Sequence, residues 1–255
     1  MELNIPMALG LFSVRDAYAR DFEGCIRQVA EMGYTGVECF GAPTLPPERV
    51  AEILHAAEMA LVGWHLPIEM LEGEAFESAL RYVQAVNCPR IVVPSADPSV
   101  FATRQGILDF AARLDAIAER FAHYGIALGY HNHAAEFRLL PDGTLPWAVL
   151  MDHTTEIFGQ LDNGNAMASA PGVLDPALLL SQWPGRAQTI HVKPYSYKNG
   201  FKTMIGEDDV DWPELLQAAE TMGGTQWLVV EYEEDDFYGQ MEGAKLCFEA
   251  LSRHA

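Results

Sequence analysis

Basic residues are scarce in this sequence. Its 255 residues include 16 Lys and Arg against 36 Asp and Glu, which gives a formal net charge of −20. Proteins that bind nucleic acids need clustered basic side chains to neutralise phosphates, and anionic membrane surfaces also attract basic proteins. The composition therefore argues against both kinds of partner. Since 49% of the residues are apolar and only 20% are charged, the chain still has ample material for a folded core.

Cysteine and long apolar runs are scarce as well. The four cysteines are widely scattered and form no C-x-x-C pair, so the sequence predicts neither a disulfide framework nor a thiolate zinc site. No run approaches the roughly 18 apolar residues of a membrane span. Residues 1–6 show neither the basic start nor the cleavage site of a signal peptide. We therefore expect a cytoplasmic protein with reduced thiols and no membrane contact.

A glycine-rich dinucleotide fingerprint, G-x-G-x-x-G, is also missing after the first apolar run, which weakens the case for an open doubly wound sheet. What the sequence does contain is a series of short apolar runs distributed along the whole chain. Such runs are typical of parallel strands that are buried on both faces. The expected strands are 8–13, 36–40, 60–65, 90–94, 126–131, 157–162, 187–191 and 226–231.

Amphipathic segments alternate with these runs. The clearest spans 103–124, where apolar residues recur at spacings of three and four, as on one face of a helix. The other expected helices are 21–32, 46–57, 74–86, 147–152, 175–183, 212–222 and 239–252. These repeated β–α units, with no linker between them, predict one domain of residues 1–255 folded as a single (β/α)8 TIM barrel. An open doubly wound sheet is the alternative.

Six of the expected strands carry, at or near their carboxyl end, a side chain that can bind a metal or move a proton. In a barrel the active site lies at the carboxyl ends of the strands, so these side chains would meet at one mouth. A single histidine at a strand end is more often structural. A cluster of carboxylates and imidazoles is different, because buried charges are costly unless they are paired or bound to metal. The six residues are Glu38, His65, His131, Asp162, His191 and Glu231.

The best metal candidates end the last three strands: Asp162, His191 and Glu231. The fifth strand ends in His131, and strand alternation places His133 on the same side of the chain. A mixed set of histidines and carboxylates suits Mn²⁺, Zn²⁺, Co²⁺ or Fe²⁺, and suits Mg²⁺ less well. The sequence thus predicts one divalent metal ion and does not choose among these metals.

Several longer motifs resemble those of a known family. They are L-F-S-V-R at 11–15, E-M-G-Y-T-G-V-E at 31–38, Y-H-N-H-A-A-E-F at 130–137, L-D at 161–162, H-V-K at 191–193, I-G-E-D-D-V-D-W at 205–212 and V-V-E at 229–231. The chain resembles the xylose isomerase-like TIM barrel superfamily, in particular a branch of sugar phosphate isomerases and epimerases with a Y-H-N-H-x-x-E-F motif. The Y-H-N-H and H-V-K pieces are distinctive together, whereas each alone would be weak.

The resemblance implies one divalent metal held by residues from strands five to eight, which in relatives are Glu, Asp, His and Glu. Three of them carry over directly as Asp162, His191 and Glu231. The fourth position differs, because this chain has His131 where relatives have a glutamate. The fourth ligand is then either His131, which we favour, or the displaced carboxylate of Glu136.

The resemblance also implies a reaction. We expect a metal-dependent isomerase or epimerase that removes the proton alpha to a carbonyl of a small sugar, polyol or keto-glycoside and passes through an enediolate. Glu231 would be the general base. One of His131, His133 and Glu136 would relay the second proton. Lys193 would turn toward the same face and steady the enolate.

Two further features concern the substrate. Glu38 and His65 match the family's substrate-side positions on strands two and three, and a hydrogen-bonded pair that closes the barrel mouth is the structural alternative. Three of the four lysines, Lys193, Lys198 and Lys202, follow the seventh strand. They could neutralise a phosphate or carboxylate of the substrate, although a solvated loop explains Lys198 and Lys202 better.

Other functions stay open at this stage. Elimination of water from a keto-polyol, as in inosose dehydratase, would use the same enediolate. Intact Asp162, His191 and Glu231 argue against a metal-free carbohydrate-binding barrel. Apurinic-site endonucleases share the superfamily but would need a richer metal cluster and a basic DNA-binding face. We expect a small carbohydrate as the partner, and the sequence leaves the oligomeric state open, a homo-oligomer included.

Overall fold

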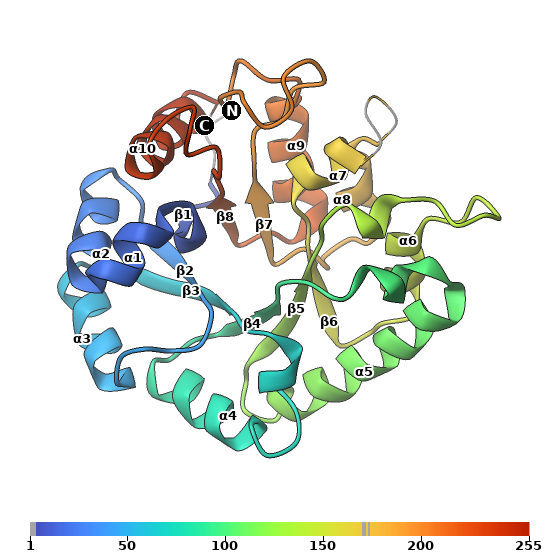
Figure 1. The fold of residues 1–255 in the computed structure, drawn as a ribbon, viewed down its shortest axis with the longest axis horizontal. Helices are drawn as coiled ribbons and strands as arrows, with labels where there is room; N and C mark the ends of the chain where they lie inside the picture. Colours follow the sequence, from blue (N-terminus) through green and yellow to red (C-terminus); the bar gives the residue numbers. More distant parts are fainter. Residues whose placement is uncertain (1–3, 170–171, 173, 255) are drawn as a thin grey trace.

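The computed structural model describes residues 4–169, 172 and 174–254. Within them, eight parallel strands form a barrel that is surrounded by helices (Figure 1). The strands are β1 Met7–Gly10, β2 Gly36–Phe40, β3 Ala60–His65, β4 Arg90–Val93, β5 Ala127–His131, β6 Ile157–Gln160, β7 Thr189–Val192 and β8 Trp227–Val230. They pair in the order β6-β5-β4-β3-β2-β1-β8-β7. This confirms the (β/α)8 barrel that the sequence predicts.

A few backbone hydrogen bonds, rather than regular strand pairing, join the β6 and β7 segments and nearly close the barrel. The amide of Gly159 donates to the carbonyl of Arg186 at 2.8 Å, and the amide of His191 donates to the carbonyl of Leu161 at 2.8 Å. An isolated parallel bridge joins Asp162 to His191. The chain therefore holds two of the predicted metal ligands side by side where the ends of the sheet meet.

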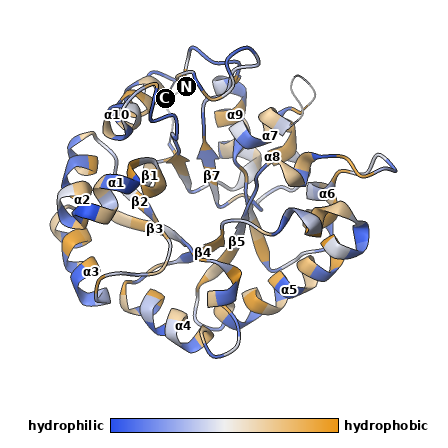
Figure 2. Ribbon diagram, viewed as in Figure 1, coloured by the Kyte–Doolittle hydropathy of each residue, from blue (hydrophilic) through white to orange (hydrophobic). Residues whose placement is uncertain are grey.

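Helices cover the outside of the barrel (Figure 1). They are α1 Arg15–Arg20, α2 Phe22–Glu31, α3 Pro47–Ala56, α4 Phe76–Ala85, α5 Arg104–Ala122, α6 Pro146–Asp152, α7 Asn163–Ser169, α8 Pro176–Gln182, α9 Trp212–Ala218 and α10 Gln240–Leu251. Apolar and hydrophilic residues alternate along them, as one-sided helices require (Figure 2). None of the helices in the described residues is long and apolar enough to cross a membrane.

The structure differs from the sequence predictions at the ends of two strands and in two added helices. β1 ends at Gly10, because residues Leu11–Val14 coil into a 3-10 helix instead of extending the strand to residue 13. The short helix α1, which follows this 3-10 helix, was not expected. Neither was α7, which begins directly after β6, where Asp162 Oδ1 accepts the amide of Asn165 at 2.7 Å. This cap stops β6 at Gln160, two residues earlier than predicted.

The barrel interior is filled at its lower end, where the strands begin. Val62 and Val229 pack there, and the guanidinium of Arg90 crosses beneath them. Arg90 Nε donates to Gln188 Oε1 at 3.1 Å, Nη1 donates to the carbonyl of Val62 at 3.1 Å, and Nη2 donates to Gln226. Each guanidinium nitrogen is thus bonded, and Arg90, itself buried, links β3 to the segments before β7 and β8 at this end. A substrate can reach the interior from the opposite end.

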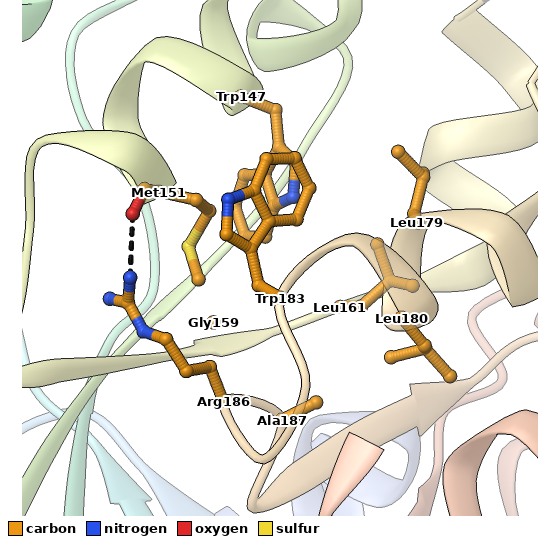
Figure 3. Close-up of a pocket in the computed structure, with 9 residues that line it drawn as sticks. All are labelled: Trp147, Met151, Gly159, Leu161, Leu179, Leu180, Trp183, Arg186 and Ala187. Carbon is orange, nitrogen blue, oxygen red and sulfur yellow. Dashed lines mark hydrogen bonds between the residues drawn. The ribbon is translucent and has the colours of Figure 1, made fainter. Parts of the chain in front are cut away.

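A small apolar cavity lies outside the barrel, against the outer face of β6 (Figure 3). Its volume is about 10 Å³, which is about the space for one water molecule. Trp147 and Met151 of α6 line one side, and Arg186 Nη1 donates to the carbonyl of Met151 at 2.5 Å. The cavity is too small for a substrate and contains no group suited to catalysis.

Candidate active site

Four side chains from β5 to β8 converge at the upper end of the barrel, where the strands end. His131, Asp162, His191 and Glu231 each offer one ligand atom, and these atoms all lie within 4.8 Å of one another. His131 Nε2 is 4.0 Å from Asp162 Oδ2, and His191 Nδ1 is 3.4 Å from Glu231 Oε2. All four residues are buried. We call these four residues the ligand cluster.

Two atoms of the ligand cluster have no hydrogen-bond partner among the described residues: Asp162 Oδ2 and His191 Nδ1. A buried polar atom without a partner is costly, and a native structure rarely leaves one without a purpose. Two imidazole nitrogens and two carboxylate oxygens are a donor set that Zn²⁺, Mn²⁺, Co²⁺ and Fe²⁺ accept. The residues present therefore fit a divalent metal ion.

The charges of the ligand cluster also favour an added cation. Burial raises the pKa of Asp162 to about 7. Burial opposes a charge on His191, yet the carboxylates of Glu231 and Glu38 raise the pKa of this imidazole to about 10. Both groups thus hold a proton more tightly than usual, Asp162 because it is buried and His191 because two carboxylates face it. A divalent ion would replace these protons.

Asn132 holds Asp162 in position. Asn132 Oδ1 accepts the amide of Asp162 at 2.9 Å, while Asn132 Nδ2 donates to the carbonyl of Asp162 at 3.2 Å. The amide of Asn165 binds Asp162 Oδ1. These three bonds fix both the backbone and one carboxylate oxygen, and they leave Asp162 Oδ2 turned toward His131.

Gln160 and Glu38 lie beneath the histidines. Gln160 Oε1 is 2.8 Å from His65 Nε2 and 3.1 Å from His131 Nδ1, and Gln160 Nε2 donates to Glu38 Oε1 at 2.8 Å. Glu38 Oε2 accepts His191 Nε2 at 2.7 Å. Burial alone would raise the pKa of Glu38, but the imidazoles of His65 and His191 hold it below its usual range. Glu38 is therefore ionised and lies under the ligand cluster, where it accepts a hydrogen bond from His191.

Lys193 joins the ligand cluster from the side. Its Nζ lies 3.2 Å from Glu231 Oε2 and 3.9 Å from Asp162 Oδ2, and it also contacts the carboxylate of Glu233. Burial opposes the ammonium charge, but these three carboxylates raise the pKa of Lys193 above its usual value. Lys193 is thus a permanent cation, held between three carboxylates at the side of the ligand cluster.

Glu136 and His133 lie on the loop after β5. Glu136 Oε1 accepts the hydroxyl of Tyr130 at 2.5 Å, and Glu136 Oε2 accepts the amide of His133 at 3.0 Å. Both oxygens of Glu136 are thereby occupied outside the ligand cluster. The ring of His133 lies 5.1 Å from that of His131 and faces the open cavity. At this position the structure brings His131, not Glu136, together with the other candidate ligands.

A cavity of about 320 Å³ opens above the ligand cluster. Its lining residues are Phe12, Phe40, Gly41, His65, Pro67, Pro94, Ser95, His131, His133, Glu231 and Glu233. Apolar side chains make one wall, where the rings of Phe12 and Phe40 meet edge to face at 5.1 Å. Of the two residues predicted to bind substrate, His65 lines this cavity, whereas Glu38 lies beneath it.

Residues 26–251 match the model of a family described as the xylose isomerase-like TIM barrel. The chain belongs to this family. The rhizopine catabolism protein MocC of Rhizobium meliloti is 27% identical to it over 91% of this chain and 81% of the relative. The inosose dehydratase of Lacticaseibacillus casei is 23% identical over 84% of this chain and 83% of the relative.

A crystal structure of a sugar phosphate isomerase/epimerase from Parabacteroides distasonis has the same fold. Its TM-score is 0.84 at 20% identity, and the match covers 97% of this chain and 93% of the other. At this identity the likeness to the crystal structure establishes the shared fold.

Three residues of the site were not predicted from the sequence: Gln160, Asn132 and Glu233. A signal existed for Gln160, because it lies two residues before Asp162, and strand alternation turns both to the same face. Asn132 and Glu233 follow strand ends, where the backbone leaves the regular sheet. Their contacts with Asp162 and Lys193 depend on loop conformations that periodicity does not describe.

Proposed function

We propose that this protein is a divalent-metal-dependent isomerase or epimerase that removes the proton alpha to a carbonyl of a small sugar, polyol or keto-glycoside. The observation that carries the proposal is the ligand cluster itself. It offers four buried ligand atoms, its Asp162 Oδ2 and His191 Nδ1 have no hydrogen-bond partner among the described residues, and its His131 and Glu231 line a cavity of about 320 Å³. The ligands would be His131, Asp162, His191 and Glu231. The candidate metals are Mn²⁺, Zn²⁺, Co²⁺ and Fe²⁺, with Mg²⁺ less suited to imidazole donors.

The metal, when bound, would polarise the substrate carbonyl and so acidify the neighbouring C–H bond. Glu231 lines the cavity, and Lys193 holds the pKa of its carboxylate well below the usual range although burial opposes this. Glu231 is therefore ionised, and its carboxylate at the cavity wall would take the proton. The Lys193 ammonium lies beside it and would stabilise the negative charge of the enediolate.

The second proton transfer needs a group on another side of the substrate. His133 lines the cavity beside His131, and its ring, which is not among the proposed ligands, can give a proton back to carbon. Glu136 reaches His133 through a backbone amide only. We therefore assign the second transfer to His133, with Glu136 holding the loop that carries it.

The cavity favours an uncharged substrate. Glu231 and Glu233 give its wall negative charge, and Lys193 is already engaged by both. Lys198 and Lys202 are not among the residues that line it. A phosphate would therefore approach carboxylates and meet no free cation among the described lining residues. The apolar wall of Phe12 and Phe40 suits the C–H face of a sugar ring.

A dehydratase is the second candidate, and the similarity to inosose dehydratase supports it. Loss of water from a keto-polyol begins with the same proton abstraction, and His133 could then protonate the departing hydroxyl. Other readings are weaker. Asp162 Oδ2 and His191 Nδ1, which have no hydrogen-bond partner in the part of the chain that the structure describes, argue against a metal-free binding barrel. The acidic cavity wall argues against a nucleic-acid substrate.

The test is incubation of the metal-loaded protein in D₂O with a panel of unphosphorylated ketoses and keto-polyols, followed by NMR. Deuterium in recovered substrate together with a new isomer supports the isomerase or epimerase. Formation of an enone or its tautomer supports the dehydratase. Absence of exchange across the panel, from protein shown to hold metal, would contradict proton abstraction.

A further inference from the structure

We propose that Gln160 is a positioning residue: together with Glu38 it sets the tautomers of the two ligand histidines so that their bare nitrogens face the ligand cluster. Gln160 is completely buried at the end of β6. The inference rests on the proposed metal site for its purpose, but its chemistry can be tested without any metal.

The first step concerns the orientation of the Gln160 amide. Its Nε2 lies 2.8 Å from Glu38 Oε1 and 2.9 Å from Thr189 Oγ1. The carboxylate of Glu38 can only accept hydrogen bonds, so the amide must present its NH₂ group to that side. The carbonyl oxygen of Gln160 is then forced to face the histidines.

The second step concerns His131. Gln160 Oε1 can only accept, and it lies 3.1 Å from His131 Nδ1. The proton of the neutral imidazole must therefore be on Nδ1. His131 Nε2 is left with a free lone pair, and this is the atom that points toward Asp162 Oδ2 at 4.0 Å. The same carbonyl oxygen lies 2.8 Å from His65 Nε2, which must also donate.

The third step concerns His191, which Glu38 orients directly. Glu38 Oε2 accepts His191 Nε2 at 2.7 Å, so the lone pair of the neutral ring is on Nδ1. That atom faces Glu231 at 3.4 Å and has no hydrogen-bond partner among the described residues. One accept-only carboxylate thus determines both ligand histidines, one directly and the other through Gln160.

Glutamine is the side chain that this place requires. Its two N–H bonds and two lone pairs all have partners: Glu38 and Thr189 on one side, His65 and His131 on the other. The Gln160 amide donates to the carboxylate of Glu38 and accepts from the imidazole of His131. A second carboxylate in its place could only accept. Groups that orient ligand histidines in this way typically change metal affinity about 10- to 100-fold when removed.

The experiment compares histidine side-chain ¹⁵N NMR spectra of the metal-free wild type and Gln160→Met, which keeps the length of the side chain and removes the amide. In the wild type we expect His131 protonated on Nδ1. In Gln160→Met we expect a mixture of tautomers and a Zn²⁺ affinity lower by about 10- to 100-fold. An unchanged His131 tautomer in folded Gln160→Met, or an unchanged Zn²⁺ affinity, would overturn the inference.

Gln188→Met is the matched control, because Gln188 also bonds inside the barrel, at the opposite end, to Arg90. We expect it to leave the histidine spectra and the Zn²⁺ affinity as in the wild type. If both variants changed the spectra equally, the effect of Gln160 would be a general loss of packing and the inference would be wrong.

Glu38→Gln is the second variant, and it keeps the test decisive if Gln160→Met does not fold. An amide at position 38 no longer dictates the direction of the Gln160 amide, so the His131 tautomer should become mixed although His131 itself is untouched. A His131 that stays fully protonated on Nδ1 would contradict the inference. Wild type that shows the expected tautomers but binds no Zn²⁺ would instead contradict the proposed function alone.

Discussion

The two ends of the barrel interior contain polar networks that differ in one respect. At the lower end, Arg90 is bonded at every guanidinium nitrogen, and Gln188 and Gln226 accept from it. At the upper end, Asp162 Oδ2 and His191 Nδ1 have no partner among the described residues. A network that satisfies itself stabilises the fold. The network at the upper end, with two buried atoms left unbonded, is arranged to bind a further group.

This difference predicts separate consequences for substitutions at the two ends. Changes at the upper end should remove metal and activity while the barrel stays folded. Changes at the lower end should cost folding stability and leave the chemistry intact. The predictions below are ordered from the largest expected effect to the smallest.

Asp162→Asn should abolish metal binding and reduce deuterium exchange into a substrate below detection. The substitution removes the charge of the carboxylate but keeps an oxygen that can accept the amide of Asn165, so α7 should still begin at the same place. Elemental analysis and the exchange assay measure the two effects. A variant that retained one divalent ion per chain would show that Asp162 is not a ligand.

Lys193→Met should lower kcat by about 10²- to 10³-fold, because the ammonium that stabilises the enediolate is gone. It should also destabilise the fold by about 3–5 kcal/mol, since Glu231 and Asp162 lose a buried counter-charge. Added Zn²⁺ should restore part of this stability. Urea titration with and without metal, together with steady-state rates, separates the two effects, and unchanged kcat would remove Lys193 from the mechanism.

Arg90→Met should lower the free energy of unfolding by about 1–3 kcal/mol, because the buried carbonyl of Val62 is left without its donor. Metal content and kcat should stay within about twofold of the wild type. Urea unfolding and metal analysis check this. A large loss of metal in this variant would show that the two ends are coupled and would contradict their expected independence.

The pH dependence of metal-free protein should differ between wild type and Asp162→Asn. Burial raises the pKa of Asp162 from 3.8 to about 7. A raised pKa contributes stability that is complete below the unfolded value and is lost as the pH rises through the folded value. Relative to Asp162→Asn, the metal-free wild type should therefore lose stability between about pH 4 and pH 7.

Metal binding should reverse this trend, because the ion replaces the protons on Asp162 and His191. The affinity for Zn²⁺ should then increase with pH over the range in which these groups titrate. Calorimetric titrations in buffers of different ionisation enthalpy count the protons released. Binding without proton release would contradict the assignment of these two ligands.

The sequence was sufficient to predict the barrel, because apolar residues recur at regular spacings in its strands and helices. Strands β2 and β3 have the predicted bounds, and the apolar stripe of α5 is buried as its spacing implies. Convergence of Asp162, His191 and Glu231 followed from the rule that barrel strands end at one mouth. These features depend on side-chain alternation, which a single sequence displays.

The supporting groups could not be predicted in the same way. Gln160 occupies a position in an otherwise apolar strand, and only the structure shows its carbonyl between His65 and His131. The choice between His131 and Glu136 depended on how the loop after β5 folds. In the structure, Tyr130 and the amide of His133 hold the Glu136 carboxylate away from the ligand cluster.

The most direct test of the central claim is anomalous diffraction from a crystal of the protein grown with Zn²⁺ or Mn²⁺. The account predicts one strong peak per chain, at about 2 Å from His131 Nε2, Asp162 Oδ2, His191 Nδ1 and a Glu231 oxygen. A fully loaded crystal with the peak elsewhere, or with His131 turned away from the metal, would contradict it.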